Sequence, residues 1–190
     1  MNNPQKITAV LDSCVLYPAQ LRDLFMHLAL KKVFRPRWSN QIHNEWISAV
    51  LRTRPDLQES QLQRTRLLMD AHVIGCLVKG YEKYIPTINL PDPKDRHVVA
   101  VAIQSSAEII VTFNLKDFPL DELAKFQICA LHPDAFLLDL LNKNPFNFLE
   151  AVIQQQKLLK RPPINKKDFI NFLAKSGLIN TANKLIEIDW

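Results

Sequence analysis

The stretch Ile7-Thr-Ala-Val-Leu11-Asp12 decides the fold class of this 190-residue chain. Strand-favouring residues that run into an acid are typical of a buried parallel strand with a polar side chain at its carboxyl end. Similar runs follow at Glu108-Ile-Ile-Val-Thr112 and at 127–131. We therefore predict three strands, with Asp12 at the tip of the first.

Helical patterns separate these strands. Apolar residues recur at helical spacing over 21–29, and Ser39 is a suitable N-cap for a second helix that contains Ile42, Trp46 and Val50 on one face. Further helices are predicted over 56–71, from Asp92-Pro93 onward, and over 120–125, whereas 73–90 stays open. This alternation predicts an α/β fold, with a parallel sheet flanked by helices.

From residue 132 onward the patterns are helical only. Helices are predicted over 135–141, 148–159, 165–175 and 178–188, with Gly177 as a helix stop and Pro162-Pro163 between the two halves. We therefore expect a sheet-containing domain over 1–131 and an α-helical C-terminal extension over 132–190.

Composition excludes several classes of site. The three glycines are too far apart for a glycine-rich phosphate loop, and the three cysteines (Cys14, Cys76 and Cys129) form no C-x-x-C pair, so we expect reduced, buried thiols. No apolar run approaches the length of a membrane span, and the first run stops at Asp12 before a signal-peptide core could form. These features predict a cytoplasmic protein.

Acidic residues fall where this topology would bring them together. Asp12 and Asp117 follow strands, Asp95 lies near a helix start, and Glu45 is on a helix expected beside the first strand. Carboxyl ends of parallel strands share one sheet edge, where α/β folds place their sites. Clustered carboxylates repel one another unless a hard cation such as Mg²⁺ or Mn²⁺ neutralises them. Such an ion can activate water, which makes phosphodiester hydrolysis the working hypothesis.

Four ordered segments carry a family resemblance. They are 9–16 (AVLDSCVL), the helix with Asn44-Glu45, 90–97 (LPDPKDRH) and 111–118 (VTFNLKDF). Together they resemble the PIN-domain ribonuclease family, specifically VapC-type toxins of toxin–antitoxin systems.

The resemblance implies a PIN-like fold and a Mg²⁺- or Mn²⁺-dependent endoribonuclease. Its implied acidic core is Asp12, Glu45 and Asp95, completed by Asp117 or Asn114, with Ser13 and Thr112 as hydrogen-bonding support. It also implies an RNA substrate, a cognate antitoxin protein as partner, and a homodimer. The alternative function is a catalytically inactive PIN-like module that binds RNA or protein.

Simpler roles compete for several of these residues. Asp92 and Asp95 could cap a helix, Asp117 could cap the helix beyond Pro119, and Glu45 could be a solvated helix residue. His97 is expected to be structural or exposed, because a hard-metal site has little need of imidazole.

Eight basic residues lie between positions 31 and 66, against three acids. They would form either a positive band that holds an RNA backbone or a solvated helix face. Trp38 and Trp46 would correspondingly be base-stacking platforms or core residues.

Overall fold

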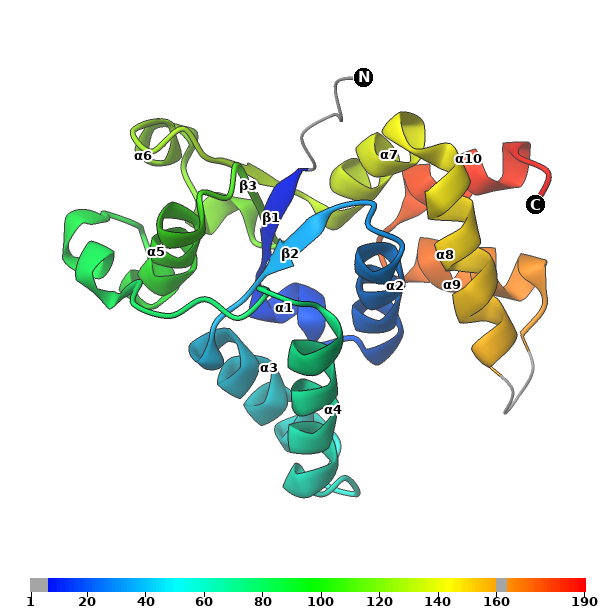
Figure 1. Ribbon diagram of the computed structural model, residues 1–190, viewed down its shortest axis with the longest axis horizontal. Coiled ribbons are helices and arrows are strands. Elements are labelled where there is room, and N and C mark those ends of the chain that lie inside the picture. Colours follow the sequence, from blue (N-terminus) through cyan, green and yellow to red (C-terminus); the bar gives the residue numbers. More distant parts are fainter. Residues whose placement is uncertain (1–6, 160–163) are drawn as a thin grey trace.

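The computed structural model describes residues 7–159 and 164–190 of the chain (Figure 1). Its sheet has four parallel strands in the order β2-β1-β3-β4. The strands are β1 (Thr8–Leu11), β2 (Arg35–Arg37), β3 (Ile109–Val111) and β4 (Cys129–Leu131). The predicted α/β class is confirmed, with helices flanking a parallel sheet.

Strand β2 was not predicted, so the expectation of three strands is wrong. Its sequence, Arg35-Pro36-Arg37, has no apolar pattern, yet its residues pair with Thr8, Ala9 and Val10 of β1. Because β2 is an edge strand, Pro36 can lack an amide donor and Arg35 can face solvent without breaking the sheet. An edge strand of this composition escapes pattern analysis.

The helices around the sheet follow the predicted patterns closely. They are α1 (Ser13–Leu16), α2 (Ala19–Leu30), α3 (Asn40–Thr53), α4 (Glu59–His72), α5 (Arg96–Ser105) and α6 (Leu120–Ala124). Ser39 is confirmed as the α3 N-cap, since its hydroxyl accepts a 3.2 Å hydrogen bond from the Ile42 amide. The single turn α1 was not predicted. The open region 73–90 contains a 3-10 helix at Glu82–Thr87.

The C-terminal extension is helical, as predicted. It comprises α7 (Pro133–Lys143), α8 (Pro145–Leu158), α9 (Lys166–Lys175) and α10 (Ile179–Glu187). The expected division at Pro162-Pro163 lies outside the described residues. Figure 1 shows these helices gathered on the α2 side of the sheet, and Phe136 of α7 packs with Phe25 and Phe34 at ring centroid distances of 6.3 and 5.3 Å. The extension therefore shares a hydrophobic core with the sheet, while the boundary at 131 stays a prediction.

The three cysteines differ in burial. All three cysteines are free, but only Cys76 is buried, and Cys14 and Cys129 are partly exposed, so the expectation of three buried thiols is wrong for two of them.

Within residues 7–159 and 164–190, no helix combines the length and apolar character needed to cross a membrane.

Candidate active site

Asp12 is the most firmly held of the predicted site residues. Leu11 pairs with Val111, so Asp12 leaves β1 beside Thr112, and its amide donates to the Val111 carbonyl at 3.1 Å. Its Oδ1 accepts from the Ser13 amide at 2.6 Å, and its Oδ2 accepts from the Thr112 hydroxyl at 2.8 Å. With 6% of its surface exposed, this carboxylate has one fixed orientation.

The loop after β3 supports Asp12 through a chain of hydrogen bonds. Thr112 is fully buried, and its hydroxyl oxygen accepts from the Asn114 amide at 3.0 Å. Ser13 contacts Asp12 through its backbone amide. The predicted support residues Ser13 and Thr112 therefore do lie beside Asp12, and Asn114 is joined to it through Thr112.

Cys14 is a neighbour of Asp12 that sequence reasoning missed. Its Sγ donates to Asp12 Oδ2 at 3.1 Å, and it accepts from the Phe113 amide at 3.4 Å. Burial, and then the charge of Asp12, raise the pKa of the Cys14 thiol to about 12. Cys14 is therefore a protonated donor to the carboxylate. The only sequence signal for this contact was the position of Cys14 two residues after Asp12.

Asp95 lies in the electrostatic field of three other carboxylates. Burial, followed by repulsion from Asp12, Asp92 and Asp117, raises its pKa to about 6. Asp92 caps the turn that Asp95 ends, because it accepts from the Lys94 amide at 2.8 Å, which confirms its predicted capping role. The structure thus brings Asp12, Asp95 and Asp117 into one region.

Asp117 ends a 3-10 turn, Leu115–Asp117, and does not cap the next helix. Helix α6 begins at Leu120 with Pro119 at its N-cap, and no side chain of the described residues makes a cap hydrogen bond there. The capping alternative for Asp117 is therefore wrong.

Glu45 points to the start of α5 and is not simply solvated. Its Oε1 lies 2.8 Å from His97 Nε2, and the side chain of Glu45 is 36% exposed, whereas that of His97 is 3% exposed. His97, two positions after Asp95, is thus a buried residue that orients Glu45, which agrees with the structural alternative expected for it and not with the exposed one. A single sequence holds no signal that pairs these two residues.

The donor chemistry suits a hard divalent cation. Carboxylate oxygens are the ligands that Mg²⁺ and Mn²⁺ prefer. Burial raises the pKa of Asp95 most, and the neighbouring carboxylates, whose charge a cation would neutralise, raise it further. Across residues 7–159 and 164–190, however, no three or more His, Cys, Asp or Glu side chains converge closely enough to hold an ion. The residues therefore fit the cation by type, and ion binding would have to draw them together.

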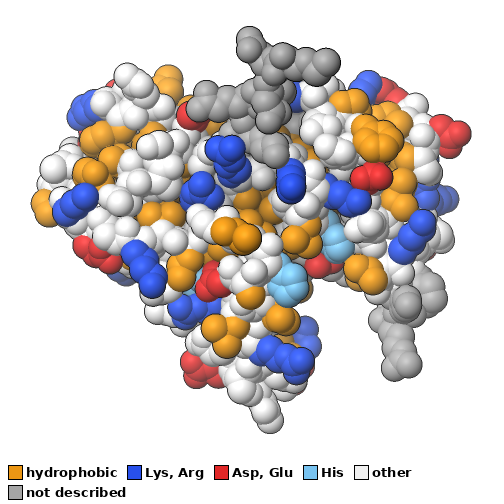
Figure 2. All heavy atoms as spheres, viewed as in Figure 1, with side chains coloured by type: hydrophobic (Ala, Val, Ile, Leu, Met, Phe, Trp, Pro, Cys, Tyr) orange, Lys and Arg blue, Asp and Glu red, His pale blue; other side chains and the backbone are white. Residues whose placement is uncertain are grey.

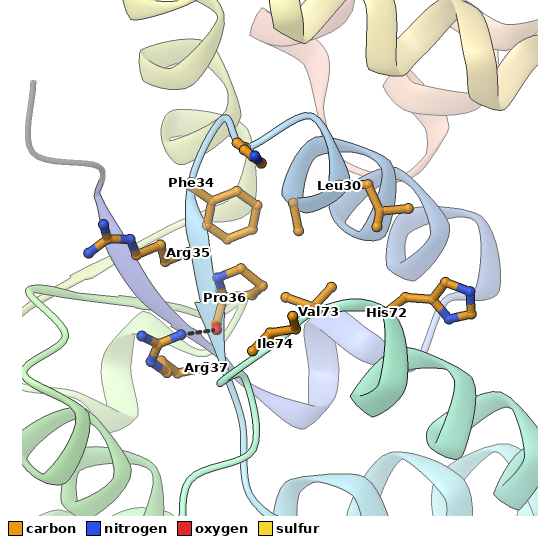
Figure 3. A pocket seen from close by; sticks show the side chains of 10 residues that line it. Leu30, Phe34, Arg35, Pro36, Arg37, His72, Val73 and Ile74 are labelled. Atoms are coloured by element: carbon orange, nitrogen blue, oxygen red, sulfur yellow. Dashed lines mark hydrogen bonds between the residues drawn. The ribbon is translucent and has the colours of Figure 1, made fainter. Parts of the chain in front are cut away.

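Part of the predicted basic band lies at β2. Figure 2 shows Lys and Arg side chains gathered over β2, and Lys32, Arg35 and Arg37 line a cavity of about 370 Å³ there. In Figure 3 both arginines extend from β2, and Arg37 donates to the Pro36 carbonyl at 3.0 Å.

Other members of the band pair with acids. Lys31 lies 3.0 Å from Glu150, and Arg54 lies 2.7 Å from Asp56. Trp38 and Trp46 are fully buried, so they are core residues and not base-stacking platforms. Lys31 and Arg54 are therefore paired with acids, while the choice between an RNA-holding band and a solvated face stays a prediction.

The chain is similar to known proteins over most of its length. A family model described as "PIN domain" matches residues 8–116, and one described as "VapC50 C-terminal domain" matches residues 133–187. A curated relative from Mycobacterium tuberculosis (strain ATCC 25618 / H37Rv), named "Putative ribonuclease VapC50", is 56% identical over 63 residues. That match covers 33% of this chain and 37% of the relative, so it spans little more than a third of the relative's length. No solved structure matches the chain.

Proposed function

The chain belongs to the PIN-domain family, and from that premise we propose that it is a metal-dependent endoribonuclease, the toxin of a VapC-type toxin–antitoxin pair. The name of the partial relative and the match of the C-terminal helices to the VapC50 C-terminal domain support this proposal. The observation that carries it is the Asp12 carboxylate, held by Ser13 and Thr112 in the field of Asp95 and Asp117.

In this proposal Asp12, Glu45, Asp95 and Asp117 hold Mg²⁺ or Mn²⁺. The bound cation supplies an activated water and neutralises charge on the phosphodiester. The chain's own groups prepare that site: the Thr112 hydroxyl and the Ser13 amide orient Asp12, and His97 orients Glu45. The substrate is RNA, and a cognate antitoxin protein blocks the acidic site in the cytoplasm. We also propose that the chain forms a homodimer and that residues 1–131 carry out catalysis.

The proposal is tested by RNA cleavage with the purified full chain. Wild-type protein should cleave a structured RNA with Mg²⁺ or Mn²⁺, and excess chelator should stop the reaction. Asp12→Asn should lower the cleavage rate by at least about a hundredfold, because it removes an anionic ligand while keeping the shape of the side chain. Asp23→Asn, on α2, is the matched control and should cleave like wild type.

One combined outcome would contradict the proposal. It is wild-type protein that cleaves no RNA at any divalent metal concentration, together with growth inhibition that survives Asp12→Asn. The second candidate is an inactive PIN-like module that binds RNA or protein. RNA affinity unchanged by Asp12→Asn, with weak metal binding in calorimetry, would support that alternative.

A further inference from the structure

Phe113 joins the loop beside Asp12 to the C-terminal extension. It lies between Thr112, which donates to Asp12, and Asn114, which donates to Thr112. Its own amide donates to Cys14 Sγ, so its backbone belongs to the site. Its half-buried ring points elsewhere, toward residues of the C-terminal helices. Any restraint on this ring is therefore transmitted to the backbone that supports Asp12.

His132, at the start of α7, packs against the Phe113 ring. The two rings meet edge to face with centroids 5.0 Å apart, a favourable geometry for aromatic pairs. His132 is also the α7 N-cap, since its Nδ1 accepts from the Asp134 amide at 3.2 Å. The same imidazole therefore makes both the ring contact and the helix cap.

The turn between α9 and α10 lies beside the same ring. Gly177 has a φ of +82°, a left-handed conformation that favours glycine, and a Cβ built there would lie 3.6 Å from Phe113 Cε1. The first turn of α10 is anchored to α7, because the Asp134 carboxylate accepts from the Asn180 and Thr181 amides at 2.9 and 2.8 Å. His132 and the Gly177 turn therefore approach Phe113 as parts of one anchored unit.

We propose that the C-terminal helices position the nuclease site by clamping Phe113 between His132 and the Gly177 turn. The clamp fixes the loop 112–114 and thereby the hydrogen bonds that orient Asp12. Phe113 and His132 are positioning residues that touch neither substrate nor cation. This gives residues 132–190 a role in the activity proposed above and rests on that activity only for its kinetic consequence.

Two substitutions of His132 separate the ring contact from the helix cap. His132→Asn keeps an N-cap side chain and removes the aromatic ring, whereas His132→Phe keeps a ring and removes the cap. The clamp predicts that His132→Asn accelerates hydrogen exchange of the Asn114 amide in the metal-free full chain, measured by NMR. It also predicts about a tenfold lower kcat with little change in KM, because a small displacement of Asp12 misaligns the reacting groups. His132→Phe should keep slow exchange and wild-type kcat but unfold at lower denaturant concentration.

Phe113→Leu tests the other partner and should reproduce the effects of His132→Asn. Phe148→Leu is the control, because Phe148 is fully buried in α8 and belongs neither to the clamp nor to the site. It should lower stability without changing Asn114 exchange or kcat.

Specific outcomes would overturn the clamp. One is unchanged Asn114 exchange in both His132→Asn and Phe113→Leu. Another is faster exchange in His132→Phe equal to that in His132→Asn, since an aromatic ring at position 132 would then give the loop no protection. If the wild-type chain cleaves no RNA, the proposed activity fails, but the exchange measurements on metal-free protein still decide the clamp.

Discussion

Asp95 carries a carboxyl group that its surroundings keep protonated to higher pH than usual. Its pKa rises from 3.8 to about 6, chiefly through burial and then through repulsion from Asp12 and its acidic neighbours. Between these two values the folded state binds more protons at this position than the unfolded state does. Its contribution to stability therefore falls as pH rises from about 4 to about 6 and is constant above that range.

Asp95→Asn should make the metal-free protein more stable than wild type at pH 7.5 and leave it about equally stable near pH 4. The reason is that asparagine replaces a carboxyl group whose ionisation is unfavourable in the folded state. Urea unfolding of both proteins at the two pH values measures the difference. Added Mg²⁺ should reverse the order at pH 7.5, because it stabilises the wild-type carboxylate. An equal stability difference at both pH values would contradict this account.

Thr112 is the residue whose hydroxyl fixes Asp12, and removing that hydroxyl should be costly. Thr112→Val keeps the shape of the side chain but removes the donor to Asp12 and the acceptor for the Asn114 amide. We expect a loss of roughly 1–3 kcal/mol in the free energy of unfolding, together with slower RNA cleavage. Thr112→Ser keeps the hydroxyl and should stay much closer to wild type in both measurements. Equal losses in the two variants would show that the methyl group, and not the hydrogen bond, matters.

Helices and strands differed in how well local patterns predicted them. Helix α3 was predicted together with its N-cap because Ser39 and the apolar face of Ile42, Trp46 and Val50 are local signals. Strand β2 was missed because its pairing with β1, and not its composition, makes it a strand. The single turn α1 was missed because one turn carries no periodicity.

The N-cap of α3 should be measurable as an element-scale contribution to stability. Ser39→Ala removes the acceptor for the Ile42 amide and should lower the free energy of unfolding by about 1 kcal/mol. Ser48→Ala is the same substitution at an exposed position inside α3, where alanine favours the helix, so it should be neutral or slightly stabilising. Denaturant unfolding of both variants makes the comparison, and equal destabilisation would contradict the capping role.

At the scale of the whole molecule, Asp134 links the helices of the C-terminal extension. Its buried carboxylate accepts hydrogen bonds from Asn180 and Thr181 at the start of α10. Burial alone would raise its pKa, but these hydrogen bonds outweigh burial and lower it. Its stabilising contribution is therefore present above its ordinary pKa and is lost as pH falls through the lower folded value.

Asp134→Ala should destabilise the full chain by roughly 2–3 kcal/mol at neutral pH, because the first turn of α10 loses charge-assisted hydrogen bonds. Asp139→Ala is the control on the same helix, since Asp139 makes a surface ion pair with Lys143 at 2.8 Å. That variant should change stability by less than about 1 kcal/mol. Thermal unfolding at matched protein concentration distinguishes the two, and equal shifts in Tm would argue against an anchoring role for Asp134.

The sequence alone determined the α/β class, the helical character of residues 132–190, the cap at Ser39 and the family resemblance carried by Asp12, Asp95 and the residues around Thr112. Each of these features follows from a short-range sequence pattern, such as an apolar run that ends at an acid, a helical period or a capping residue. Only the tertiary structure paired Glu45 with His97, Cys14 with Asp12, and Phe113 with His132 and Gly177. Such contacts are set by which surfaces meet when the sheet and helices pack, and local patterns in a single sequence do not specify those partners.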